Sequence, residues 1–251
     1  MEEIKSVNNQ LVKDTLKLQQ KKFRDAENKF LLEGYKAVEE AVLAGIEIDY
    51  LFVNSLNIDK YSFYNGRKIL TDEIVLKKIS TTDTAPEVVG VAVQKTYNPK
   101  IFKNLKKIIL LEGIKDLGNL GTILRSAAAF GVDGVILYGN CADIYNPKCV
   151  RASVGNLWKI PFVYIKEFGL LENLFSDRQR TATLPRSDKY LKDYKSEDKT
   201  LIMFGSEADG LSDELINFAT DDVKIEMADS VESLNLAVSC SVVAYHIMFE
   251  K

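Results

Sequence analysis

The sequence predicts an α/β protein in two parts, and three observations carry this prediction. From Ile108 onward, short apolar runs alternate with segments of helical periodicity, which is typical of a mostly parallel sheet with helices on both faces. Residues 1–94 mix helical and extended patterns of their own, and the polar, basic stretch 95–107 separates the two parts. We therefore expect a small α/β domain over 1–94, a linker over 95–107 and a larger α/β domain over 108–251.

In the first part, apolar residues spaced among charges predict an exposed helix over Val7–Arg24, and a second helix over Glu33–Ala44 that ends at Gly45. Runs rich in β-branched and large apolar residues predict extended segments at Phe30–Leu32, Ile46–Val53 and Val88–Val93.

In the second part, strands are expected at Ile108–Glu112, Gly134–Tyr138, Phe162–Ile165, Thr181–Leu184, Leu201–Phe204 and Val223–Ile225. Helices are expected at Asn119–Phe130, Pro147–Gly155, Ser212–Phe218 and Leu234–Phe249.

The composition is that of a globular protein outside the membrane. Of the 251 residues, 46% are hydrophobic and 27% are charged, which is ordinary for a soluble domain. No apolar run approaches the roughly 20 residues that span a bilayer, and the acidic, polar N-terminus does not have the pattern of a signal peptide. The three cysteines form no CxxC pair, and an odd number argues against a disulfide framework. We expect a cytoplasmic protein.

The charge is divided unevenly along the chain. The net charge is −3, but residues 1–107 hold 18 Lys and Arg against 15 Asp and Glu, while residues 108–251 hold 15 against 21. The first part is basic enough to touch phosphates, although this excess is a weak electrostatic footprint for a nucleic-acid binder. The aromatic residues show no stacking pattern that differs from that of a core.

The sequence lacks the residues that several classes of enzyme require. The only histidine is His246, which argues against Ser-His-Asp chemistry and excludes an HExxH zinc site. The sequence contains neither a GxxxxGK[ST] loop for nucleoside triphosphates nor a GxGxxG loop for dinucleotides. The chemistry therefore has no obvious general base.

Polar residues follow three of the expected strands, in the segments Asn119–Arg125, Gly205–Leu211 and Ser233–Asn235. Open α/β sheets bind ligands beyond the carboxyl ends of their strands. Three such segments in one sheet predict a single site.

Each segment also has a simpler interpretation. Asn119 suits the N-cap of its helix, and Arg125 lies on the polar side of that helix, where it is either functional or a solvated charge. Gly205 allows a backbone to approach a ligand without interference from a Cβ atom, or merely forms a turn. Asn235 offers a donor and an acceptor to a ligand, or caps the last helix.

A further stretch, Tyr145–Gly155, places Lys148 and Arg151 around a helix start. It is either a phosphate contact or an ordinary surface helix.

Taken together, the order and spacing are specific. The patterns Asn119-x-Gly121-x3-Arg125, Gly205-x-Glu207-x2-Gly210 and Ile225-x-Met227 … Ser233-Leu234-Asn235 closely resemble the three motifs of the SpoU (TrmH) family of RNA ribose 2′-O-methyltransferases. Residues 1–94, with Asn9-x-x-Val-Lys13 and Lys21-Lys22-x-Arg24, resemble the ribosomal-protein-like substrate-binding domain of the rRNA-modifying branch. Two positions depart from the family, because Leu117 and Glu226 stand where proline is usual.

The resemblance implies a C-terminal domain with a trefoil knot, S-adenosyl-L-methionine as cofactor, no metal, and a homodimer that methylates a ribose 2′-OH, most often in 23S-type rRNA. It implies cofactor contacts at Gly205, Gly210, Ile225, Met227 and Leu234. It implies catalytic roles for Arg125, Asn119, Glu207, Ser233 and Asn235. It implies RNA contacts at Lys13, Lys21, Lys22, Arg24, Lys148 and Arg151.

By this resemblance, Arg125 is the residue most often given the catalytic role in the family, sometimes as a base. An arginine deprotonates very rarely, because its pKa lies above about 12, so we expect it to clamp a phosphate beside the target ribose. Three alternatives stay open at this point: a tRNA 2′-O-methyltransferase, a non-catalytic RNA-binding protein, and a dinucleotide-dependent oxidoreductase.

Overall fold

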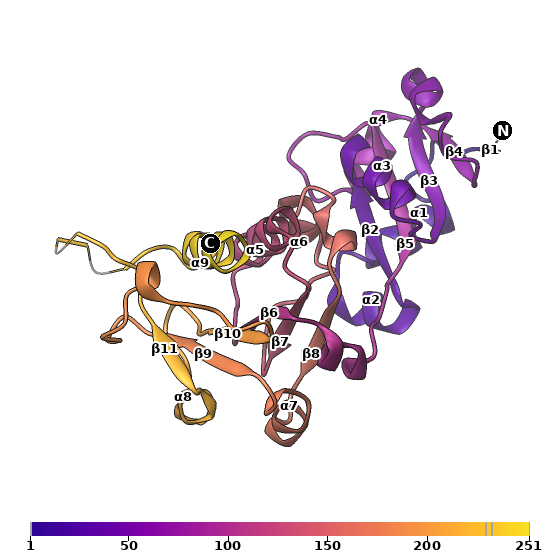
Figure 1. Ribbon diagram of the computed structural model, residues 1–251. Coiled ribbons are helices and arrows are strands. Elements are labelled where there is room, and N and C mark those ends of the chain that lie inside the picture. Colours follow the sequence, from indigo (N-terminus) through magenta and orange to yellow (C-terminus); the bar gives the residue numbers. More distant parts are fainter. Residues whose placement is uncertain (1, 229, 232, 251) are drawn as a thin grey trace. The chain divides into compact units, whose positions relative to one another are not determined.

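A computed structural model describes residues 2–228, 230–231 and 233–250, and the chain forms two compact units (Figure 1). Unit 1 contains the chain up to Lys95 together with the segment Asp143–Trp158. Unit 2 contains Thr96–Ala142 and the chain from Lys159 onward.

Unit 1 is built on a five-stranded sheet with the order β1-β4-β3-β5-β2. Strands β1, β4 and β3 run parallel, while β5 is antiparallel to both β3 and β2. The strands are β1 (Glu2–Glu3), β2 (Lys29–Glu33), β3 (Ile48–Asn54), β4 (Lys68–Thr71) and β5 (Val88–Val93). The helices are α1 (Gln10–Lys17), α2 (Lys21–Glu27), α3 (Tyr35–Leu43), α4 (Glu73–Ile79) and α6 (Pro147–Ala152), with a 3-10 helix η1 at Ser55–Tyr61.

The single helix expected over Val7–Arg24 is wrong, because the chain turns between α1 and α2. The Arg24 guanidinium holds this turn by donating hydrogen bonds to the carbonyl oxygens of Leu18 and Gln19, at 2.9 and 2.8 Å. The turn contains neither proline nor glycine, so the residues that usually mark the end of a helix are absent. The sequence analysis also did not identify β1, β4 or α4.

The segment Asp143–Trp158 completes the interior of unit 1. The ring of Phe30 on β2 lies 4.7 Å from that of Tyr145 and 5.4 Å from that of Trp158, centroid to centroid. The Tyr145 hydroxyl also donates to the backbone carbonyl of Lys95 at 2.6 Å and accepts from its N–H at 2.7 Å. From sequence, this segment belonged to the second part of the chain.

Unit 2 is built on a six-stranded sheet with the order β11-β9-β10-β6-β7-β8, in which every pairing is parallel. The strands are β6 (Lys107–Glu112), β7 (Gly134–Tyr138), β8 (Phe162–Ile165), β9 (Gln179–Thr183), β10 (Thr200–Phe204) and β11 (Asp221–Val223). The helices are α5 (Leu117–Phe130), α7 (Phe168–Phe175), α8 (Asp213–Phe218) and α9 (Leu236–Phe249). Short 3-10 helices occupy Pro99–Asn104, Asn156–Lys159 and Leu191–Asp193, the second of them continuing from the segment that belongs to unit 1.

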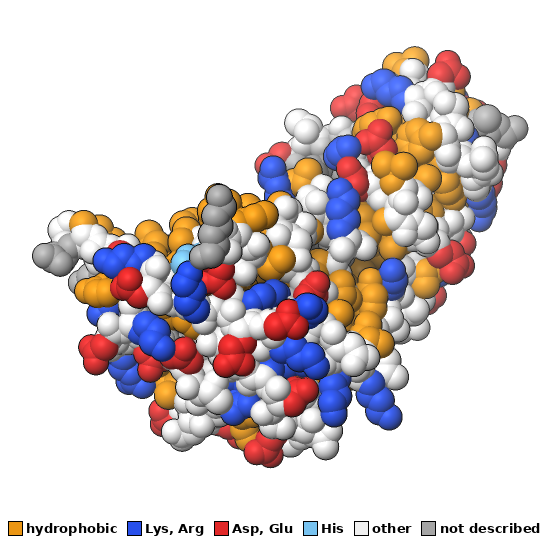
Figure 2. All heavy atoms as spheres, viewed as in Figure 1, with side chains coloured by type: hydrophobic (Ala, Val, Ile, Leu, Met, Phe, Trp, Pro, Cys, Tyr) orange, Lys and Arg blue, Asp and Glu red, His pale blue; other side chains and the backbone are white. Residues whose placement is uncertain are grey.

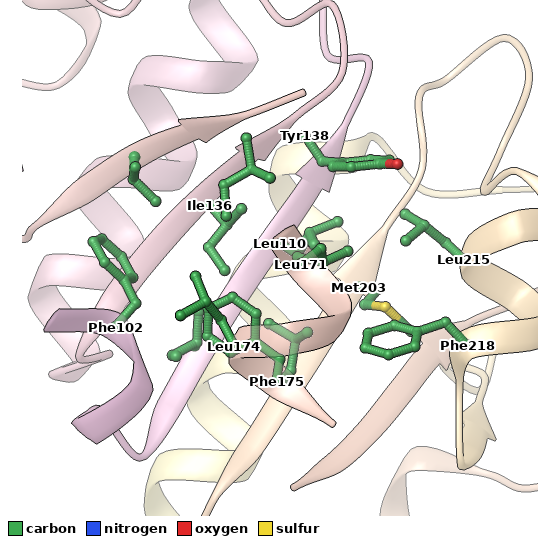
Figure 3. Packing of buried hydrophobic residues seen from close by; sticks show 14 of the residues in the cluster. Phe102, Leu110, Ile136, Tyr138, Leu171, Leu174, Phe175, Met203, Leu215 and Phe218 are labelled. Carbon is green, nitrogen blue, oxygen red and sulfur yellow. The ribbon is translucent and has the colours of Figure 1, made fainter. Parts of the chain in front are cut away.

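Helices cover both faces of this sheet, as the alternating pattern predicts. Figure 1 shows α5 and α9 on one face and α7 and α8 on the other. The core on the second face is close-packed around Leu110, Ile136 and Met203 from the central strands, with Leu174 and Phe218 from the helices (Figure 3). Alternate strand residues such as Ile109 and Leu111 are equally buried, which explains why the strands read as continuous apolar runs.

The described residues lack two features. No helix among them is long and apolar enough to cross a membrane. Nor do they contain a group of three or more His, Cys, Asp or Glu side chains that could hold a metal ion.

Candidate active site

The strands β9, β10 and β11 end at a common cavity of about 560 Å³ in unit 2. Its walls come from the segments that follow these strands and from the start of α9. The lining residues include Thr183–Pro185, Phe204–Leu211, Val223–Ile225, Met227, Ser233–Leu236, Ser239 and Val243.

All five residues predicted to bind a cofactor line this cavity, as do the predicted Glu207, Ser233 and Asn235. Leu184 and Pro185 also line the cavity and were not predicted from the sequence, although they follow an expected strand in the same way as the other segments. The end of β9 was the signal that could have identified them.

A chain of hydrogen bonds joins the three polar segments. The Asn235 side-chain amide donates to the Asn119 Oδ1 at 3.1 Å, and the Asn119 amide donates to the Glu207 carboxylate at 2.5 Å. These residues come from α5, from the loop after β10 and from the start of α9. The prediction that the three segments meet is confirmed.

The start of α9 fixes which groups donate and which accept in this chain of hydrogen bonds. Asn235 is the N-cap of α9, and its Oδ1 accepts hydrogen bonds from the backbone N–H groups of Ala237 and Val238 at 3.0 and 3.3 Å. Because the oxygen is engaged in capping, the amide nitrogen must face Asn119 as a donor. Asn119 then accepts through its oxygen and donates to Glu207.

The expected N-cap role of Asn119 is wrong. The N-cap of α5 is Asp116, whose carboxylate accepts from the Asn119 backbone N–H at 2.7 Å. Asn119 lies inside the first turn, so its side chain is available to Glu207 and Asn235. Leu117, at the position where the family usually has proline, is the first residue of the helix.

Arg125 lies two turns further along α5 and is exposed. Within the part of the chain that the structure describes, its guanidinium makes no hydrogen bond or ion pair, so it remains available to an external anion. The neighbouring Ser126 accepts a hydrogen bond from Ser241 of α9 at 2.7 Å, which ties the two helices together.

The backbone of the loop after β10 requires glycine at position 205. A Cβ atom there would lie 1.9 Å from the carbonyl carbon of Gly210 and 2.1 Å from the backbone nitrogen of Leu211. The loop after β10 folds back on itself, with the Gly210 N–H donating to the Ser206 carbonyl at 3.0 Å. The interpretation that Gly205 leaves room for a ligand is therefore corrected, because the missing side chain leaves room for the loop that walls the cavity.

No described thiol is prepared to act as a nucleophile. Burial raises the pKa of Cys240, on the buried side of α9, well above its usual value, and the nearby Glu207 carboxylate raises it further. Burial likewise raises the pKa of Cys141 and Cys149. These groups stay protonated near neutral pH, and a protonated thiol is a poor nucleophile.

Of the six residues predicted to contact RNA, two form ion pairs inside unit 1, and only Arg24 is too deeply buried to make the expected contact. Arg24 has an exposed fraction of 1% and forms an ion pair with Asp143 at 2.5 Å inside unit 1. Arg151 pairs with the buried Glu33 carboxylate at 2.7 Å. Both arginines therefore hold unit 1 together.

The four predicted lysines, namely Lys13, Lys21, Lys22 and Lys148, are exposed. On the face shown in Figure 2, basic and acidic side chains are intermixed over unit 2.

Comparisons with known proteins agree with this geometry. Residues 106–245 match the SpoU rRNA Methylase family, and residues 9–90 match the MRM3-like substrate binding domain. A Synechocystis protein named as an uncharacterized tRNA/rRNA methyltransferase is 32% identical, over 96% of this chain and 92% of its own length. The Bacillus subtilis 23S rRNA (guanosine(2553)-2′-O)-methyltransferase RlmP is 29% identical, over 98% and 99%.

Among solved structures, an AdoMet-bound rRNA methyltransferase from Sinorhizobium meliloti superposes with a TM-score of 0.88. It is 28% identical, over 98% of this chain and 96% of that one. A SpoU methyltransferase from Streptomyces viridochromogenes, AviRb, in complex with AdoMet, superposes with a TM-score of 0.87 at 25% identity, over 96% and 97%. On the family match over more than half of its length, this chain belongs to the SpoU rRNA methylase family.

Proposed function

We propose that this protein transfers the methyl group of S-adenosyl-L-methionine to a ribose 2′-OH of ribosomal RNA. The observation that carries the proposal is the Asn235–Asn119–Glu207 hydrogen-bond chain beside the cavity. It joins polar groups from three strand ends where a parallel α/β sheet binds its ligands.

The cavity fits the cofactor. Its volume lies in the range of about 300–1,000 Å³ that is usual for small-molecule sites. Apolar side chains such as Leu184, Leu211 and Val243 in the lining suit an adenine ring. The carboxylates of Glu207 and Asp209, also in the lining, suit a sulfonium cation. When bound, S-adenosylmethionine supplies an electrophilic methyl group.

Orientation of the substrate is then the main task of the protein's own residues. Asn119 and Asn235 hold Glu207 in one direction beside the cavity, and Ser233 adds a hydroxyl to its wall. Arg125 has a planar guanidinium that no described residue engages, which suits bidentate contact with a phosphate of the RNA. Holding the ribose hydroxyl in line with the methyl group accounts for much of the rate in a displacement of this kind.

We also propose that the protein is a homodimer through α9. Helix α9 has a second apolar face, which is exposed and carries Val238, Val242, Tyr245 and Phe249, spaced to fall on one side of the helix. The Tyr245 and Phe249 rings pack with Phe130 of α5, at centroid distances of 5.6 and 6.3 Å. An exposed apolar stripe of this kind indicates an interface. Arg125 belongs to α5, the helix that packs against α9, so a partner subunit bound along α9 would help to build the site.

Three further parts of the proposal rest on family membership. Unit 1 would be the reader of the RNA, since its residues 9–90 match a substrate-binding domain. The chain after β10 would form the trefoil knot of the family. The protein would work in the cytoplasm.

The test is transfer of a labelled methyl group from S-adenosylmethionine to a 23S rRNA transcript, followed by mapping of the 2′-O-methylated nucleotide. Arg125→Ala and Arg125→Lys are both expected to abolish transfer while leaving the ligand-induced thermal shift intact, because a point charge does not replace the guanidinium fork. Transfer to tRNA transcripts alone would support the tRNA alternative. Binding of RNA without a thermal shift from S-adenosylmethionine would support a non-catalytic protein.

For the dimer, Tyr245→Asp is expected to halve the mass in sedimentation, because it places a charge in the apolar stripe. The matched variant Leu56→Asp, at an exposed leucine of unit 1, should leave the mass unchanged. A monomeric wild-type protein would contradict this part of the proposal.

A further inference from the structure

The turn between α1 and α2 places the half-buried ring of Phe23 among surface lysines of unit 1. The Lys22 ammonium lies 4.7 Å from the centroid of the Phe23 ring, and the Lys17 ammonium lies 5.9 Å from it. Lys13, one turn before Lys17, is on the same face of α1. We call these four residues, Lys13, Lys17, Lys22 and Phe23, the α1–α2 corner.

The segment around this corner is basic. Residues 10–29 hold six Lys and Arg against three Asp and Glu, which equals the whole excess of residues 1–107. Lys17 and Lys21 are paired with Asp14 and Asp25. Lys13 and Lys22 are exposed and form no ion pair with any residue of the described chain, so their charge is available to a ligand.

The corner is held rigidly from within. The buried Arg24 guanidinium binds the Leu18 and Gln19 carbonyls of the turn and pairs with Asp143. The Gln94 amide donates to the carbonyls of Arg24 and Lys29, at 3.0 and 3.1 Å, at the other end of α2. A surface that is fixed before binding loses less conformational entropy when a ligand arrives.

We infer that the α1–α2 corner binds an unpaired nucleotide of the RNA substrate, with the base stacked on Phe23 and the lysines on the flanking phosphates. A flexible lysine can leave the ring, because a base stacked on an aromatic side chain gains more than an exposed cation–π contact does. The displaced ammonium then neutralises a phosphate. This inference rests on the proposed RNA substrate, and it assigns part of the binding of that RNA to the α1–α2 corner.

The first test measures RNA binding by the full-length protein without S-adenosylmethionine. The probes are a 20-base-pair RNA duplex and the same duplex with a three-nucleotide bulge. We expect the wild type to prefer the bulged RNA, because only an unpaired base can stack on a protein ring. Equal affinity for the two RNAs would overturn the inference.

The second test compares two aromatic positions of unit 1. Phe23→Leu should weaken binding of the bulged RNA about tenfold and leave the plain duplex within about twofold, while Phe23→Trp should restore the affinity. Phe63→Leu is the control, since Phe63 is an exposed phenylalanine of the same unit that packs with Tyr35 and Tyr61. Equal losses in Phe23→Leu and Phe63→Leu would contradict a role for the corner.

The third test concerns the lysines. Lys13→Gln and Lys22→Gln should each reduce the slope of log affinity against log salt by about 0.7, the value for one phosphate contact on a single strand. Lys78→Gln, which makes the same charge change at an exposed lysine of α4, should leave the slope unchanged; an equal reduction there would point to diffuse attraction. Because binding is measured apart from methyl transfer, an inactive wild type with these binding properties would refute the proposed function and leave this inference standing.

Discussion

Beside the cavity, the direction of two side-chain amides is set by a helix cap. Asn235 caps α9 with its oxygen, so its amide nitrogen donates to Asn119, and Asn119 in turn donates to Glu207. One backbone requirement thereby orients a carboxylate that comes from a different strand. Conservative changes within this chain are the sharpest way to test whether its direction matters.

Asn235→Asp is expected to lower the turnover number at least tenfold, or about 1.4 kcal/mol, while the melting temperature stays within about 2 °C of the wild type. An aspartate still caps the helix. It removes the amide donor, however, so whichever way Asn119 then turns, its oxygen faces a carboxylate. Methyl-transfer rates at saturating RNA measure the effect, and wild-type turnover in this variant would show that the chain is not required.

Gly205→Ala is expected to lower both the free energy of unfolding, by about 1–3 kcal/mol, and the thermal shift produced by S-adenosylmethionine. The added Cβ would meet backbone atoms, which cannot move aside as a flexible side chain does. The matched control is Gly169→Ala at the start of α7, where a Cβ meets nothing within 4 Å. If the two variants melt alike and bind the cofactor alike, the loop does not depend on Gly205.

At the level of elements, α5 shows what the unusual Leu117 changes. Leu117 is the first residue of the helix, a position where proline is well tolerated because its missing N–H would have no helical partner. The preceding Asp116 is extended, with φ −74° and ψ 119°, as a residue before proline must be. The departure from the family therefore removes rigidity and no chemical group.

Leu117→Pro is accordingly expected to fold and to transfer methyl groups, with a free energy of unfolding within about 1 kcal/mol of the wild type. Leu120→Pro is the contrast, because Leu120 is fully buried inside the same helix and proline there costs about 3 kcal/mol or more. Denaturant unfolding measures both. Loss of the fold in Leu117→Pro would mean that the Leu117 side chain has a packing role that its position does not suggest.

The elements of unit 2 were more predictable from sequence than those of unit 1. Buried parallel strands such as Gly134–Tyr138 are continuous apolar runs, and their carboxyl ends must lie at one edge of the sheet, so the meeting of three polar segments followed from the pattern. Strands β1 and β4 are short, and β1 is entirely charged, so neither carries a hydrophobic period. The split between α1 and α2 depends on Arg24 and Asp143, which are far apart in sequence, and local patterns cannot show such a pair.

At the scale of the whole molecule, the segment Asp143–Trp158 changes what a truncation would do. Removing residues 1–94 takes away Phe30, Arg24 and Glu33, the partners of Trp158, Tyr145, Asp143 and Arg151. Residues 95–251 alone would therefore expose two aromatic side chains and leave two charged groups without these partners.

The only tryptophan of the chain, Trp158, reports on this directly. It is buried against Phe30 in the intact protein, so the fragment 95–251 should show red-shifted tryptophan emission and a strong tendency to aggregate. Phe30→Ala in the full chain should shift the emission in the same direction, and Phe63→Ala should not. A monodisperse fragment with the emission of the intact protein would show that the segment folds without its partners.

The buried pair of Arg24 and Asp143 also has a consequence for synthesis on the ribosome. Arg24 is synthesised early, and 118 further residues separate it from its partner Asp143. At roughly 5–20 residues per second, their synthesis takes several seconds. During that interval the nascent N-terminal part holds Arg24 without its partner Asp143, and the Phe30 ring without Tyr145 and Trp158. Stalled chains ending near residue 125 should therefore be protease-sensitive throughout, whereas chains in which residue 158 has cleared the exit tunnel should gain resistance in one step.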